Sequence, residues 1–90
     1  MLEANVKIVN YLGLHARAAA QLVRAASQFK CKIKLIRADN GVNADAKSIL
    51  SVLTLAAPKG TEIQVETEGD DESQAMQTIK NLFADGFGEA

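Results

Sequence analysis

The sequence predicts an α+β fold, a two-layer open-faced β-sandwich in which four antiparallel strands carry three helices on one face. Apolar and polar residues alternate in strand-like segments, whereas other segments repeat their apolar residues at helical spacing. Asn40-Gly41 joins two strand-like segments as a hairpin turn. The predicted order is β-α-β-β-α-β-α. Each strand offers one apolar side, so we expect the three helices to share that face.

The first half of the chain contains a strand, a helix and a hairpin. Residues 2–8 alternate apolar and polar side chains, and a helix is expected from Ala16 to about Lys30. Its apolar face comprises Ala19, Leu22, Val23, Ala26 and Phe29. Residues 32–35 and 42–44 then form the arms of a hairpin, whose type I′ turn needs positive φ at both Asn40 and Gly41.

The second half is expected to contain two helices and a strand. One helix begins at Ser48 and reaches about Leu55, and Thr61–Thr67 forms a strand after a turn at Pro58-Lys59-Gly60. The last helix ends near Asp85-Gly86, with a buried face of Met76, Ile79, Leu82 and Phe83. Either Asp70 or Asp71 is expected to cap it, with Gln74 in capping-box position after Asp71.

Composition excludes several classes of protein. Ninety residues, 48% of them hydrophobic, suffice for one domain spanning residues 1–90. A net charge of −1 argues against nucleic-acid binding, and one Cys with one His argues against a zinc site. No apolar run is long enough to insert into a membrane, and no leader-like segment opens the chain. We therefore expect a cytoplasmic monomer without metal or cofactor.

Charge is distributed unevenly along the chain. Residues 1–47 hold eight Lys and Arg against three acids, a net +5, whereas residues 48–90 hold two against eight, a net −6. Two interpretations remain open. The basic residues could cluster and attract an anionic partner, or they could be ordinary solvated charges.

The segment Leu12-Gly13-Leu14-His15-Ala16-Arg17-Ala18 places the one histidine where a loop enters a helix. With His15 as N-cap, the backbone N–H groups of Ala16, Arg17 and Ala18 would surround its ring and form an anion site. The Arg17 guanidinium could grip phosphate oxygens. This arrangement suits acceptance of a phosphoryl group. The alternative is that His15 is an ordinary loop residue and Arg17 a solvated one.

Gly13-Leu14-His15-Ala16-Arg17 resembles the phosphohistidine motif of the HPr family, the histidine-containing phosphocarriers of the bacterial phosphoenolpyruvate-dependent phosphotransferase system. Ala46-Lys47-Ser48-Ile49-Leu50 resembles the regulatory-serine segment of that family, and the likeness covers nearly the whole chain. The ending Leu82–Glu89 is similar to the nitrogen-related branch. One position departs from the pattern, because Ala18 stands where the family usually has proline.

The resemblance implies a role for each matched residue. His15 would accept a phosphoryl group on Nδ1 from phosphorylated enzyme I and pass it to an enzyme IIA-type protein, while Arg17 neutralises its charge. Ser48 would be the target of an HPr kinase/phosphorylase, although its hydroxyl also suits a plain helix N-cap. Such a protein is a carrier in a relay and not an enzyme with independent turnover.

The partner-docking surface is expected to combine apolar and basic residues. The short helix after Ser48 has few polar positions, so part of its apolar surface either stays exposed for docking or packs into the core. Ile49 and Leu53 are its expected exposed members. Arg24 and Lys47 would steer an acidic partner or remain solvated. The full predicted docking set is Leu14, Arg24, Lys47, Ile49, Leu50 and Leu53.

Two other functions remain open at this point. The chain could be a regulatory module, like the nitrogen-related branch, that controls partners by its phosphorylation state without sugar transport. It could instead be a small-molecule-binding α+β domain in which His15 only caps a helix. The protein that accepts the phosphate distinguishes the regulatory module from a sugar-uptake carrier. Detection of a phosphohistidine would exclude the small-molecule-binding domain.

Overall fold

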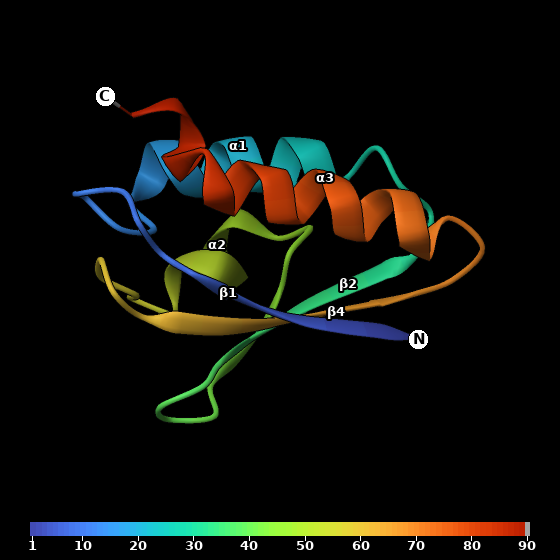
Figure 1. Ribbon diagram of the computed structural model, residues 1–90, viewed down its shortest axis with the longest axis horizontal. Helices are drawn as coiled ribbons and strands as arrows, with labels where there is room; N and C mark the ends of the chain where they lie inside the picture. Colours follow the sequence, from blue (N-terminus) through green and yellow to red (C-terminus); the bar gives the residue numbers. More distant parts are fainter. Residues whose placement is uncertain (90) are drawn as a thin grey trace.

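The computed structural model describes residues 1–89, and the order of its elements is the predicted one, followed by a short 3₁₀ helix (Figure 1). The elements are β1 Leu2–Lys7, α1 Ala16–Ala26, β2 Lys32–Arg37, β3 Asn43–Asp45, α2 Ile49–Leu53, β4 Glu62–Glu68, α3 Glu72–Ala84 and η1 Gly86–Gly88. The predicted strands and helices therefore all form, with differences at their ends.

The four strands make one antiparallel sheet in the order β1-β4-β2-β3. Strand β4 lies between β1 and β2, so the last strand in sequence is central in the sheet. Val65 of β4 faces Ala4 on one side and Leu35 on the other. Ile63 and Val65 are fully buried, as their alternation with polar residues predicted.

The helices cover one face of the sheet, which confirms the predicted two-layer α+β class. Figure 1 shows α1 and α3 side by side above the strands, with the shorter α2 beside them on the same face. An aliphatic core fills the space between the layers. Its largest fully buried side chains include Ile8, Leu22, Leu35, Val52, Leu55, Ile63, Ile79 and Phe83. Val23, Phe29 and Leu82, predicted to be buried, are only partly covered and pack at its margin.

The hairpin between β2 and β3 forms, but not with the predicted type I′ turn. Only Gly41 has positive φ, at +73°, whereas that turn needs positive φ at both central residues. Arg37 N–H donates to the Val42 carbonyl at 2.9 Å, and Gly41 N–H donates to the Arg37 carbonyl at 2.8 Å. The loop is therefore wider, and β3 begins at Asn43 instead of Val42.

Two predictions about helix ends were wrong. Helix α1 ends at Ala26 and not near Lys30. Asp71 is the N-cap residue of α3 but does not cap it with its side chain. Its carboxylate instead accepts hydrogen bonds from the backbone N–H groups of Lys30 and Cys31, at 2.8 and 3.0 Å. These bonds tie the start of α3 to the start of β2.

Among residues 1–89, no helix has both the length and the apolar character that crossing a bilayer requires.

Candidate functional site

His15 stands at the surface where a tight loop enters α1. It is the N-cap residue in extended conformation, and its carbonyl accepts a hydrogen bond from Ala19 N–H at 2.8 Å. Its side chain is 24% exposed and makes no capping hydrogen bond to the helix. The residue thus directly precedes the first-turn backbone N–H groups that have no partner within the helix. A role confined to capping α1 has no support, because the ring does not cap it.

The loop before His15 is held by close backbone packing. Gly13 has φ +67°, and a Cβ atom there would lie 2.5 Å from the Ala57 carbonyl oxygen and 2.9 Å from Pro58 Cα. The next residue, Leu14, donates its N–H to the same carbonyl at 2.9 Å. Its side chain is buried in the core. Leu14 therefore anchors the loop from within, and its place in the predicted docking surface was wrong.

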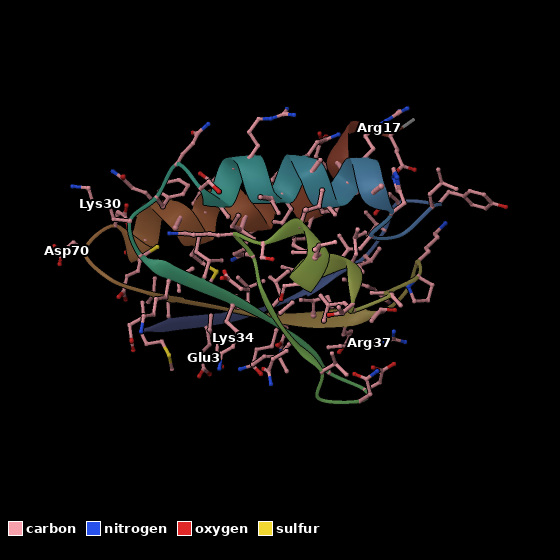
Figure 2. All side chains as sticks on the ribbon, turned by 180° about the vertical axis from the view of Figure 1, so that it is seen from behind. Glu3, Arg17, Lys30, Lys34, Arg37 and Asp70 are labelled. Atoms are coloured by element: carbon pink, nitrogen blue, oxygen red, sulfur yellow. The ribbon has the colours of Figure 1, made fainter. Side chains whose placement is uncertain are left out.

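The first turn of α1 presents a partly exposed set of groups. Ala16 and Arg17 are exposed, and Figure 2 shows the Arg17 side chain projecting at the end of the molecule where α1 begins. Ala18 is fully buried, so its amide is covered by neighbouring atoms. The accessible end of the helix is therefore formed by Ala16 and Arg17. The role of these groups in holding phosphate stays a prediction.

A carboxylate from the C-terminal segment contacts the histidine ring. Glu89 Oε2 lies 2.7 Å from His15 Nε2 and accepts a hydrogen bond from Asn10 Nδ2, also at 2.7 Å. Asn10 is buried, and its Nδ2 donates a second bond to the Gly13 carbonyl at 2.7 Å. The bonds from His15 and then Asn10 hold the pKa of the Glu89 carboxyl below its usual value of 4.5.

Asn10 and Glu89 are site residues that no pattern in the sequence predicts. Glu89 is 74 positions from His15, and no local pattern reports a contact across that separation. One signal was available in the sequence. Phe87 is an apolar residue between two glycines, and a buried aromatic beyond the last helix indicates that the chain end folds back onto the core.

Ser48 is the N-cap residue of α2, as predicted. Its Oγ accepts a hydrogen bond from Ser51 N–H at 3.3 Å, and the residue is partly exposed. This contact accounts for a serine at this position without any modification, and it leaves the regulatory role a prediction.

The apolar residues of α2 divide between the core and the surface. Val52 is buried, whereas Ile49 and Leu53 are 39% and 36% exposed. Leu50 is the most exposed residue of the helix, at 75%, whereas the sequence predicts Ile49 and Leu53 as its main exposed members. An exposed apolar surface of Ile49, Leu50 and Leu53 therefore exists on α2, which packs against α1.

The basic residues do not gather on one surface. Figure 2 shows Arg17 and Lys30 at opposite ends of the molecule, with Lys34 and Arg37 below, on the sheet side. Arg24 is exposed on α1, and Lys47 Nζ donates to the Phe29 carbonyl at 2.7 Å. The interpretation as ordinary, dispersed charge is favoured over a single basic cluster.

Fold and site together define a small α+β protein that presents one histidine at a helix start. Comparison with known proteins agrees with this class. Residues 2–85 match the family model described as "PTS HPr component phosphorylation site". A phosphocarrier protein HPr of Neisseria meningitidis is 45% identical over 89 residues, which cover 99% of this chain and 98% of the relative.

Other matches point the same way. An HPr from Cupriavidus necator is 46% identical over 89 residues, again covering 99% of this chain and 98% of the relative. The crystal structure of an HPr from Thermoanaerobacter tengcongensis superposes with a TM-score of 0.92 at 36% identity, covering 100% of this chain and 99% of that one. The chain belongs to the HPr family. It is a phosphocarrier of the phosphotransferase system and not an independent enzyme.

Gly13 offers a test of the loop packing. Gly13→Ala should lower the free energy of unfolding by about 2–4 kcal/mol, because left-handed φ and an overpacked Cβ add their costs. Gly41→Ala is the matched control, since Gly41 has a similar φ but open space around it, and it should cost about 1–2 kcal/mol. Denaturant unfolding measures both. Equal losses would contradict close packing at Gly13.

The Glu89 contact predicts a pH dependence. Because the carboxyl pKa is lowered in the folded state, the contact stabilises the C-terminal segment at neutral pH. That contribution should disappear as pH falls below 4.5 and through the lowered pKa. An NMR titration of the Glu89 carboxyl measures this directly. Asn10→Ala removes one of the two bonds and should raise the midpoint toward 4.5; an unchanged midpoint would count against the contact.

Proposed function

We propose that His15 is the residue that carries the phosphoryl group, on Nδ1. One observation carries this proposal: the ring is partly exposed at a helix start, and its hydrogen bond within residues 1–89 is made by Nε2. This arrangement leaves the Nδ1 lone pair available to an incoming phosphorus atom. The donor would be the phosphohistidine of an enzyme I-type protein, and the acceptor a histidine of an enzyme IIA-type protein.

The phosphate would be held by groups at the start of α1. Ala16 and Arg17 are exposed residues of the first turn, so their amides would be within reach of a phosphate, and the Arg17 guanidinium would offset its charge. The amide of Ala18, which proline would lack, could contribute only after the atoms that cover it move. A phosphate held by Ala16 and Arg17 does not need that third amide.

Partner proteins would dock on the exposed apolar surface of α2. Ile49, Leu50 and Leu53 offer an apolar contact area, and Arg24 on α1 and Lys47 add positive charge for an acidic partner. The amine of Lys47 is engaged with a backbone carbonyl, so Arg24 is the freer of the two. An HPr kinase/phosphorylase would add phosphate to Ser48 at the edge of this surface.

Residues 1–90 would form one phosphocarrier domain that acts as a monomer in the cytoplasm. A regulatory module of the nitrogen-related type would use the same His15 chemistry and would differ in the protein that receives the phosphate. Incubation of the phosphorylated protein with candidate enzyme IIA proteins of both kinds distinguishes these functions.

The histidine assignment predicts a complete loss of phosphate uptake. His15→Ala removes the acceptor nitrogen, so incubation with phosphoenolpyruvate and enzyme I should leave the variant unlabelled. The wild-type label should be acid-labile and alkali-stable, as a phosphohistidine is. Ser48→Ala serves as the control and should keep that label. An acid-labile phosphate on His15→Ala would contradict the assignment.

The docking proposal predicts that negative charge at Ser48 slows phosphorylation of His15. Ser48→Asp should reduce the rate with enzyme I by about 5- to 30-fold, if the added charge costs about 1–2 kcal/mol in docking. Ser48→Asn is nearly identical in shape and also caps helices well, so it should keep close to the wild-type rate. Equal rates for the two variants would show that charge at Ser48 does not affect docking.

A further inference from the structure

The C-terminal segment reaches the site through one carboxylate oxygen. Glu89 Oε2 is 2.7 Å from both His15 Nε2 and Asn10 Nδ2, and Asn10 in turn holds the Gly13 carbonyl. In Figure 1 the red C-terminal segment turns back from α3 toward the blue start of α1. These bonds therefore join the chain end, the loop and the ring in one connected network.

The position of Glu89 is fixed by structure that precedes it. Gly86, Phe87 and Gly88 have φ of +59°, +57° and +74°, and Phe87 is 3% exposed. Its ring packs edge-on against Phe83, with centroids 5.1 Å apart. A left-handed phenylalanine costs on the order of 1 kcal/mol, so it persists because this packing holds it. This anchored turn therefore places the Glu89 carboxylate beside the His15 ring.

This segment lies beyond residues 2–85, which the family model matches. Asn10 also fixes the Glu89 carboxylate in place. It is 5% exposed, and its Nδ2 donates hydrogen bonds to Glu89 and to the Gly13 carbonyl. Turning the amide over would place its oxygen against two other oxygens, so the donor must face them.

The contact determines which ring nitrogen carries the proton. An ionised carboxylate only accepts hydrogen bonds, so at 2.7 Å from Glu89 the Nε2 atom must carry hydrogen. A neutral imidazole has a single N–H, and its lone pair then lies on Nδ1. His15 Nδ1 makes no capping bond to α1, so nothing in the first turn of the helix occupies that lone pair.

We propose that Glu89, supported by Asn10, is a positioning residue for phosphoryl transfer that keeps His15 protonated on Nε2 and free on Nδ1. This inference rests on the proposed function of His15 and assigns the tautomer to a residue outside the phosphohistidine motif. Glu89 does not touch the phosphorus atom.

The transfer step follows from this arrangement. The Nδ1 lone pair of His15 forms the new N–P bond while the N–P bond of the donor phosphohistidine breaks, and that electron pair stays on the donor imidazole. His15 then holds the phosphoryl group on Nδ1 and the proton on Nε2, so its ring is positively charged. The Glu89 carboxylate faces that charge from the Nε2 side and stabilises it.

The test compares Glu89→Ala with Glu3→Ala, which removes a carboxylate from β1, on the opposite layer from Arg17 in Figure 2. Nitrogen-15 NMR of the His15 ring reports the tautomer without any phosphate donor. Wild type and Glu3→Ala should show the Nε2–H form. Glu89→Ala leaves no carboxylate to accept from Nε2, so its ring should show a mixture of both tautomers.

The same proteins are then phosphorylated with phosphoenolpyruvate and enzyme I. Removing the partner that orients a metal-binding histidine typically costs 10- to 100-fold, and by the same logic uptake by Glu89→Ala should be slower by about tenfold or more. A ring that stays entirely in the Nε2–H form in Glu89→Ala overturns the inference, whether or not uptake slows. A wild-type protein that takes up no phosphate overturns the function proposed for His15 instead, and the ring spectrum still tests Glu89.

Discussion

The site depends on how tightly the loop before His15 packs against the backbone that precedes β4. Gly13 fits against Ala57 and Pro58 with no room for a side chain, and Leu14 adds both a hydrogen bond to Ala57 and a buried side chain. Because Leu14 points into the core, its neighbour His15 lies at the surface with the chain extended. Helix α1 then begins in a fixed place, with His15 as its N-cap residue and the free N–H groups of its first turn directly after it.

The sequence predicted those features that local patterns control. Alternation identified β4 and its buried residues Ile63 and Val65, and helical spacing identified α1 and α3. The position of His15 at the start of α1 followed from the change of period after Gly13. The N-cap role of Ser48 was equally readable, because serine at a helix start satisfies an N–H group within three residues. Each of these features is decided by neighbours along the chain.

Features that depend on distant partners could not be predicted in the same way. Asp71 was expected to cap α3, but its carboxylate instead binds backbone N–H groups 40 positions away at Lys30 and Cys31. The N-cap pattern tells only which N–H groups of its own helix an aspartate can bind. It does not tell which N–H groups elsewhere in the fold compete for the same carboxylate. The same limit applied to Glu89, whose two partners lie at the other end of the chain. Burial of Leu14 was missed because a leucine in a loop has no period to indicate its side.

A carboxylate beside a phosphate acceptor raises the question of repulsion. Glu89 contacts Nε2, and the phosphoryl group is proposed to bind Nδ1, so the imidazole ring separates the two negative groups. Phosphorylation of a ring that keeps its Nε2 proton makes the ring positive, and that charge lies between them. His15 stands at the N-terminus of α1, and that positive helix end and the exposed Arg17 in its first turn would favour a phosphate bound there. In the proposed phosphorylated state the charges would therefore alternate in sign, from carboxylate to imidazolium to phosphate to guanidinium, and each neighbouring pair would attract.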